Sequence, residues 1–230
     1  LARGNITLLT KAQVVKINMT GNSVSGVTFK HKGKIHSVEA NKEVILSGGA
    51  INSPHILMIS GIGPSDHLRE HGIDVHVDLP GVGQNLQDHS CVILQYECKK
   101  SFPIHKVNQP HRKLATGIKW VFTRKGIGAS NIWEAGGLIR SNSKAAYPDI
   151  QYHFGPVGFE YDDNKISLLQ AFAIHVDQLR PRSRGQITLK SANPLEKPLM
   201  TFNYLQDPED LAEMLNGVKK ARELISQRAF

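Results

Sequence analysis

One short segment constrains the fold of this chain more than any other. An apolar stretch, Glu43 to Ser47, runs into the glycine pair Gly48-Gly49, then Ser53-Pro54, and ends at Gly61. Serine is a good helix N-cap and proline is favoured in the first helical turn, while glycine often ends a helix. The segment therefore predicts a strand, a tight turn, and a helix that begins within two residues of Pro54.

The same turn is suited to a ligand. Two adjacent glycines let a backbone or a ligand come close, because neither carries a side chain. The N-terminus of a helix also favours anions such as a pyrophosphate. On these grounds the segment is an α/β turn that can face a phosphate.

The residues of this segment also resemble a known family. Gly49-Ala50, Ser53-Pro54, Ile56-Leu57 and Ser60 to Gly63 match the second signature of the glucose–methanol–choline (GMC) oxidoreductases, flavoproteins that oxidise alcohols with FAD. The resemblance extends over nearly the whole chain. Three further stretches carry it: Leu79 to His89, Leu179 to Gly185, and Asp207 to Leu211.

The resemblance implies an α+β chain in two parts. Residues 1–88 would be the C-terminal part of an α/β FAD-binding domain. Residues 89–230 would be an antiparallel-sheet substrate domain, with the C-terminal region of the family starting at about residue 180. Pro80 to Gln87, with two glycines and no apolar period, is expected to cross between them.

The dinucleotide fingerprint Gly-x-Gly-x-x-Gly is absent from the chain. In the family this fingerprint lies near the N-terminus. The chain also starts at Leu1 rather than Met and stops at Phe230. The chain is therefore expected to be an internal fragment.

Cofactor contacts are expected, by the resemblance, at Val14, Gly48, Gly49, Ala50 and Ser53. Val14 occupies the family position whose backbone contacts the adenine of FAD. The other four are small residues beside a helix start. A plain core valine and close packing are the alternatives. The family's catalytic His, with its second His or Asn, lies in a region that nothing here resembles, so no catalytic residue is assigned.

Eleven histidines raise the question of a metal or catalytic site. His67 and His71 can share one helix face, but zinc needs a third ligand, so a solvated face is favoured and no metal is assigned. His153 and His175 lie on expected strands. They either line the substrate cavity or are satisfied sheet residues, and the second interpretation is favoured.

The net charge of +8 and a pI of about 9.5 raise the possibility of a nucleic-acid partner. The basic residues look scattered apart from Arg180, Arg182 and Arg184, whose spacing predicts a solvated or salt-bridged face. No nucleic-acid motif accompanies them. No apolar run is long enough for a membrane span. Neither a nucleic-acid partner nor a membrane span is therefore expected.

Cys91 and Cys98 would point to opposite faces of one strand and would not form a local disulfide, which predicts two buried thiols. Two glycosylation sequons, at Asn5 and Asn18, are compatible with a secreted protein, although such sequons also arise by chance.

The remaining pattern completes the picture. Residues 6–47 predict short antiparallel strands with turns at Gly21-Asn22 and Lys32 to Lys34. Helical apolar spacing predicts helices over Arg112 to Phe122 and Glu209 to Gln227, and the segments between them predict an antiparallel sheet.

The expected function is FAD-dependent oxidation of an alcohol or sugar hydroxyl. Within the family the resemblance is to the insect glucose dehydrogenase type, which passes electrons to a quinone; another acceptor or oxygen is also possible. The chain by itself, without the fingerprint and the catalytic His, is expected to be inactive. The alternative is a non-catalytic binding or structural module that keeps the fold.

Overall fold

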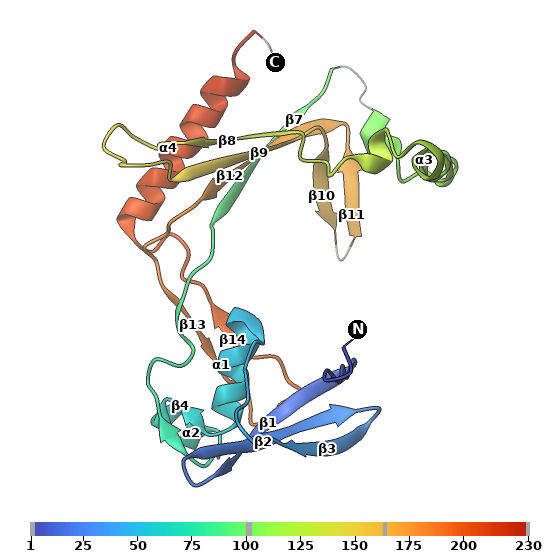
Figure 1. Ribbon diagram of the computed structural model, residues 1–230. Helices are drawn as coiled ribbons and strands as arrows, with labels where there is room; N and C mark the ends of the chain where they lie inside the picture. The colour runs from blue at the N-terminus through green and yellow to red at the C-terminus, as the bar shows by residue number, and fades with distance from the viewer. Residues whose placement is uncertain (1–2, 100–102, 163–164, 229–230) are drawn as a thin grey trace. The chain divides into compact units, whose positions relative to one another are not determined.

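The computed structural model describes residues 3–99, 103–162 and 165–228, which form two compact units (Figure 1). Unit 1 contains the described residues up to Gln87 together with Arg184–Asn203. Unit 2 contains Asp88–Ser183 and the described residues from Tyr204 onwards. The chain first leaves unit 1 beside Asp88, where a crossing was expected. The sequence predicted a single boundary, between residues 88 and 89, and therefore did not predict that residues 184–203 return to unit 1.

Unit 1 begins with an antiparallel meander of β1 (Ala12–Thr20), β2 (Ser23–His31) and β3 (Lys34–Glu39). Lys32 and Gly33 both have positive φ, 49° and 80°, as a two-residue hairpin turn requires for strands with a right-handed twist. The predicted hairpins are confirmed. The strand expected at residues 6–9 is absent, since the structure gives these described residues no ladder partner.

Helix α1 (Gly49–Ile59) begins earlier than the sequence predicted. Its N-cap is Gly48 rather than Ser53, and Pro54 lies inside the helix. The missing N–H of Pro54 deprives only the carbonyl of Ala50, which lies in the exposed first turn and remains open to water. The helix therefore runs through the proline, and residues 55–59 are helical as expected.

The strand expected over Glu43 to Ser47 is also absent. Within the described parts of the chain no neighbouring strand pairs with these residues, and Ile45 is 79% exposed. A strand is defined by its ladder, so an apolar pattern alone does not make one.

The core of unit 1 brings together segments that are far apart in the sequence. Met58 and Ile59 of α1 pack with Leu68 of α2 (Ser65–Glu70) and with Ile187 and Leu189. Ile187 belongs to β13 (Gly185–Thr188), which lies between β14 (Leu199–Thr201) and β6 (Gln84–Leu86). A short parallel pair, β4 (Ile62–Gly63) and β5 (Val77–Asp78), completes the unit. Burial of Ile187 and Leu189 is the reason that residues 184–203 join unit 1.

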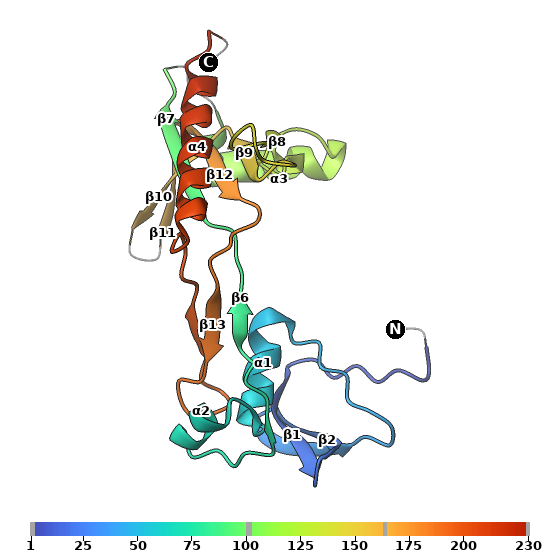
Figure 2. The same cartoon turned by 90° about the vertical axis from the view of Figure 1, so that its left-hand side faces the viewer.

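Unit 2 is built on a four-stranded antiparallel sheet in the order β7-β12-β9-β8. These strands are β7 (Cys91–Glu97), β12 (Ala171–Gln178), β9 (Ile150–Gly155) and β8 (Ala135–Ile139). Helix α4 (Pro208–Ile225) covers one face (Figure 2), where Met214 and Ala221 pack on Ile150, Ile174 and Val176. The fold class is therefore α+β, as predicted.

The remaining elements of unit 2 are short or peripheral. A hairpin of β10 (Gly158–Asp162) and β11 (Lys165–Leu169) precedes β12, and Gln170 separates β11 from β12. The side-chain amide of Gln170 donates to the carbonyl of Cys98, 2.9 Å away, which fixes the bend. Two short 3-10 helices, η1 (Pro103–Lys106) and η2 (Ile127–Ala129), flank α3 (Pro110–Thr123). Within the described parts of the chain, none of the helices combines the length and apolarity needed to cross a bilayer.

Candidate functional site

The sheet of unit 2 has a polar face opposite α4. Side chains alternate along a strand, so the neighbours of the core positions point away from the helix. His153 on β9 lies opposite His175 on β12, and Asp177, two residues further along β12, lies opposite Cys91 on β7. Four chemically active side chains from three strands are thereby gathered on one surface.

The contacts on this face are close. His153 Nε2 lies 3.4 Å from Asp177 Oδ2, and Cys91 Sγ lies 3.7 Å from His175 Nδ1. The ring of Trp133, just before β8, meets the His175 ring edge-on at 4.6 Å between centroids and the His153 ring at 5.6 Å. We call Cys91, Trp133, His153, His175 and Asp177 the polar sheet face.

Two atoms of the polar sheet face lack a hydrogen-bond partner. Both atoms are buried: His175 Nε2 has no hydrogen-bond partner among the described residues, and Asp177 Oδ2 has no hydrogen bond there beyond its 3.4 Å contact with His153 Nε2. Burial lowers the pKa of His175 and outweighs the opposing charge of Asp177, while His153 lowers the pKa further. Buried polar atoms are normally paired. The interpretation of His175 as a sheet residue whose ring nitrogens are both hydrogen-bonded is therefore wrong, because Nε2 has no partner among the described residues. A polar ligand could supply that partner.

The sequence named the two histidines of this face but missed Trp133, Asp177 and Cys91. The sequence did contain one signal for Asp177: it lies two residues after His175 on an expected strand, so the two side chains should share a face. The pairing of β12 with both β7 and β9 could not be predicted from a short stretch of sequence, because even its nearest partners, Ala173 and Gly155, are 18 positions apart.

The thiol of Cys91 is expected to react slowly with iodoacetamide at neutral pH. Burial first, and then the hydrogen bond and charge of Asp177, raise its pKa to about 12, so almost none of the reactive thiolate is present. Mass spectrometry of timed alkylation checks this, with urea-unfolded protein as the reference. Modification of Cys91 at the unfolded rate would show that Asp177 does not suppress ionisation.

The expected cofactor residues lie in unit 1 on two elements that contact each other. Val14 is half-buried on β1, beside an irregularity in the pairing with β2. Gly48, Gly49 and Ala50 form the start of α1, and Ser53 lies one turn further on. The two elements are tied by the backbone N–H of Ile17, which donates to Ser60 Oγ at 2.8 Å.

The start of α1 fits an anionic group. No side chain among the described residues caps it, and its first turn contains no acidic residue. Gly49 has φ +81° and lies in open space, so the backbone turns there without a side chain in the way. Free N–H groups at an exposed helix start favour a phosphate. The glycines of this turn thus fit one end of a dinucleotide.

The structure gives His67 a hydrogen-bonding role that competes with metal binding. His67, Glu70 and His71 lie within 4.8 Å of one another, which is close enough to hold an ion. However, His67 Nε2 accepts the N–H of Leu189 at 2.9 Å, so the proton of the neutral ring sits on Nδ1 and no lone pair is free. The solvated-face interpretation is wrong for His67, which instead links α2 to the segment after β13.

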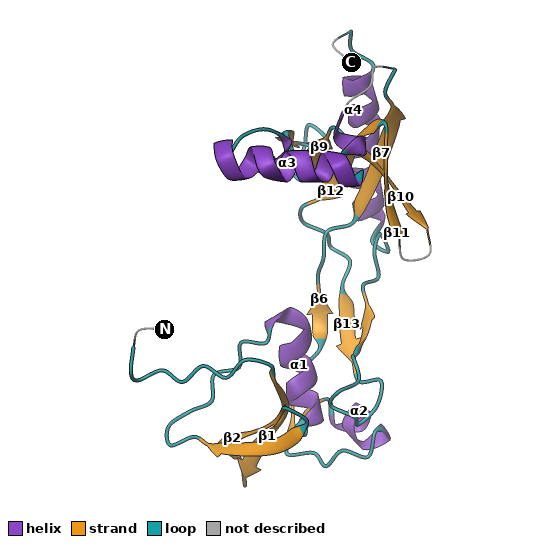
Figure 3. Cartoon of the chain, turned by 90° about the vertical axis from the view of Figure 1, so that its right-hand side faces the viewer, coloured by secondary structure: helices purple, strands orange, loops and turns teal. Residues whose placement is uncertain are grey.

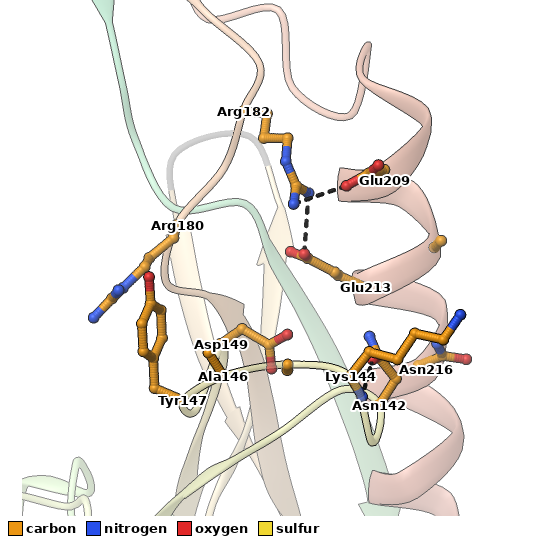
Figure 4. Close-up of a pocket in the computed structure, with 12 residues that line it drawn as sticks. Asn142, Lys144, Ala146, Tyr147, Asp149, Arg180, Arg182, Glu209, Glu213 and Asn216 are labelled. Atoms are coloured by element: carbon orange, nitrogen blue, oxygen red, sulfur yellow. Dashed lines mark hydrogen bonds and ion pairs between the residues drawn. The ribbon is translucent and has the colours of Figure 1, made fainter.

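A pocket of about 500 Å³ lies between α4 and the connection from β8 to β9 (Figure 4). Arg182 reaches into it but is paired with Glu209 at 2.7 Å and Glu213 at 3.1 Å. Arg180 stacks over Tyr147, 3.9 Å from the ring centroid. The salt-bridged interpretation is therefore confirmed for Arg182. Because the guanidinium is already paired, the polar sheet face, where buried polar atoms lack hydrogen-bond partners within the described parts of the chain, is the stronger candidate for a ligand site.

Comparisons with known proteins agree with this picture. Family models described as GMC oxidoreductase match residues 1–91 and 181–229. Oxygen-dependent choline dehydrogenases of Staphylococcus haemolyticus (strain JCSC1435) and Staphylococcus aureus (strain N315) are each 42% identical over all 230 residues. The chain spans 40% of the length of each of these relatives.

Solved structures show the same fold. A formate oxidase matches with a TM-score of 0.85 and 26% identity, over 97% of this chain and 44% of that one. A formate oxidase of Aspergillus oryzae described for its FAD modification has a TM-score of 0.80 and 24% identity, over 93% and 42%. The pyridoxine 4-oxidase of Mesorbium loti matches with 0.77 and 24%, over 99% and 41%.

Proposed function

Because the chain belongs to the GMC oxidoreductase family, with FAD as its cofactor, we propose that the protein oxidises the hydroxyl group of a small alcohol. FAD supplies the hydride acceptor in such a reaction. The residues of this chain would hold the two reactants: the start of α1 and Val14 on the cofactor side, and unit 2 on the substrate side. The expected division into residues 1–88 for the FAD-binding domain and 89–230 for the substrate domain is part of this proposal, with Arg184–Asn203 moved to the FAD-binding side because they pack in unit 1.

The observation that carries the proposal is the polar sheet face. Asp177 offers a buried carboxylate oxygen whose contact on this face is His153 Nε2 at 3.4 Å, and His175, on the same strand, offers a buried Nε2 atom without a hydrogen-bond partner among the described residues. Trp133 supplies an aromatic surface against both histidines. Together these groups can orient a polar alcohol.

Two substrate classes are consistent with these groups. A carboxylate beside an indole ring is the chemistry that binds a quaternary ammonium, and the curated relatives carry choline in their names. We therefore place a choline-like amino alcohol first. A sugar hydroxyl, as in the glucose dehydrogenase type that the sequence resembles, is second. Oxygen, a quinone or another acceptor would take the electrons.

The full-length protein is expected to show bleaching of its flavin absorption band when choline is added without oxygen. Glucose is the comparison substrate. Bleaching by glucose alone would move the substrate to the sugar class, and no bleaching with any alcohol would favour the non-catalytic module.

A variant tests the role of the polar sheet face in the same protein. Replacing Asp177 with Asn is expected to raise KM for choline at least about tenfold, because a contact to a charged group is lost. The matched control is Asp162→Asn on β10, which lies outside the polar sheet face and should leave KM unchanged. An unchanged KM in Asp177→Asn would show that the substrate does not bind at the polar sheet face.

A further inference from the structure

The positive charge of this chain is concentrated in one stretch. No acidic residue occurs between Glu97 and Glu134, whereas eight lysines and arginines do. Removing these eight from the 28 basic residues of the chain leaves 20, equal to its 20 acidic residues, so this stretch carries the whole net charge of +8. The net charge is therefore concentrated in this stretch, while the other 20 basic residues are spread over the rest of the chain and balanced by acidic residues.

The centre of this stretch is α3, an amphipathic helix in which no residue is buried. Leu114, Ile118, Val121 and Phe122 line one face, and a shallow groove runs along them. Leu114 is 66% exposed and Phe122 is 83% exposed. Figure 3 shows α3 extending outward from the sheet of unit 2. We call these four residues the apolar face of α3.

Cations border the apolar face of α3 on both sides. Lys113 lines the same groove. Around the helix, Arg112, Lys119 and Lys125 line a pocket of about 270 Å³ between α3 and η2, whose other lining residues carry no charge. None of these four cations has an acidic partner among the described residues.

We propose that α3 lies in the surface of an anionic phospholipid bilayer. The apolar face of α3 would enter the boundary between headgroups and acyl chains. The bordering cations would contact the phosphates, with their long aliphatic stems lying along the apolar surface. This inference goes beyond the proposed oxidation and does not depend on it.

The combination of positive charge and apolar surface favours an anionic lipid over a protein or a nucleic acid as the binding partner of α3. A helix face that packs on protein has no need of unpaired cations along both borders. A nucleic acid would use the cations but would leave Leu114, Ile118 and Phe122 in water. An anionic lipid surface satisfies both, since it offers phosphates at the level of the cations and hydrocarbon beneath.

Vesicle sedimentation of the full-length protein tests the proposal. Vesicles of phosphatidylcholine with one-third phosphatidylglycerol are expected to bind the protein, and vesicles of phosphatidylcholine alone far less. Each cation removed, in Lys119→Gln and in Lys125→Gln, should weaken binding about fivefold. Added salt should weaken it further, because it screens exposed charges.

Matched variants separate the helix from the rest of the surface. Leu114→Ser with Phe122→Ser should abolish binding, while Leu138→Ser on β8, which is 60% exposed, and Lys165→Gln on β11 should leave it unchanged. Thermal melts of all variants should coincide, since the altered side chains are exposed. No binding to anionic vesicles, or equal binding by the α3 variants and the controls, would overturn the proposal and point to a protein segment covering the apolar face of α3.

Discussion

Replacing Asp210 with alanine is expected to lower the free energy of unfolding by about 4 kcal/mol, which is enough to unfold many small domains. The carboxylate is fully buried at the start of α4. It accepts the N–H groups of Arg182 at 2.8 Å and Ser183 at 2.7 Å, the Ser183 hydroxyl at 2.6 Å, and the Gln178 amide at 3.0 Å. Alanine would leave these donors buried without that acceptor. Urea denaturation followed by circular dichroism measures the loss.

The same carboxylate makes stability depend on pH in a defined direction. Burial raises the pKa of Asp210, but the hydrogen bonds from Arg182, Ser183 and Gln178 outweigh it and hold the pKa below its ordinary value of 3.8. The stabilisation is therefore complete above about pH 3.8 and is lost as the pH falls through the lower value of the folded state. Asp210→Ala should remove this acid dependence.

A matched control distinguishes the buried hydrogen bonds of Asp210 from an exposed ion pair. Glu209, the next residue back, forms an exposed ion pair with Arg182. Glu209→Gln should cost less than about 1 kcal/mol, as is usual for exposed pairs. Equal losses in the two variants would mean that the buried hydrogen bonds contribute no more than surface charge.

The 230-residue chain by itself is expected to retain no FAD after purification and to oxidise no alcohol, even with excess FAD. The chain contains no Gly-x-Gly-x-x-Gly sequence, and pyrophosphate binding in dinucleotide folds depends on that loop and the helix behind it. The start of α1 would supply only part of the site. Hydride transfer also needs the substrate, a base and the flavin held together, which is worth on the order of 7–11 kcal/mol.

Absorbance spectra and a dye-reduction assay check both statements, with the full-length protein as the positive control. A purified chain that carries stoichiometric flavin would show that unit 1 alone binds the dinucleotide. Turnover that disappears on replacing His153 or His175 would place the catalytic base on the polar sheet face.

Local signals predicted those elements whose stabilising contacts are also local. The hairpin at Lys32-Gly33 depends on two residues with positive φ, and α4 depends on its N-cap Asp207 and on an apolar face repeated over five turns. Both were anticipated from a few neighbouring residues. The signature at Gly49 to Gly63 predicted the family for the same reason, because it is one uninterrupted stretch.

Elements that depend on distant partners were missed or misplaced. Glu43 to Ser47 has the composition of a strand but no ladder partner among the described residues. The start of α1 is determined by the backbone turn at Gly49, which overrides the signal of Ser53-Pro54. The polar sheet face required the pairing of β12 with two strands at once, and no short motif encodes such a pairing.

The alternation of the chain between units 1 and 2 has a consequence for biosynthesis. Met58 and Leu68 emerge from the ribosome early, but Ile187 and Leu189, which complete their core, emerge only after most of unit 2 has been made. Unit 1 must therefore wait in an incomplete, aggregation-prone form while the sheet of unit 2 is synthesised. Unit 2 in turn waits for α4, whose residues Met214 and Ala221 pack into the core of its sheet. Translation that stalls between Gln87 and Ile187 would therefore leave the cores of both units incomplete.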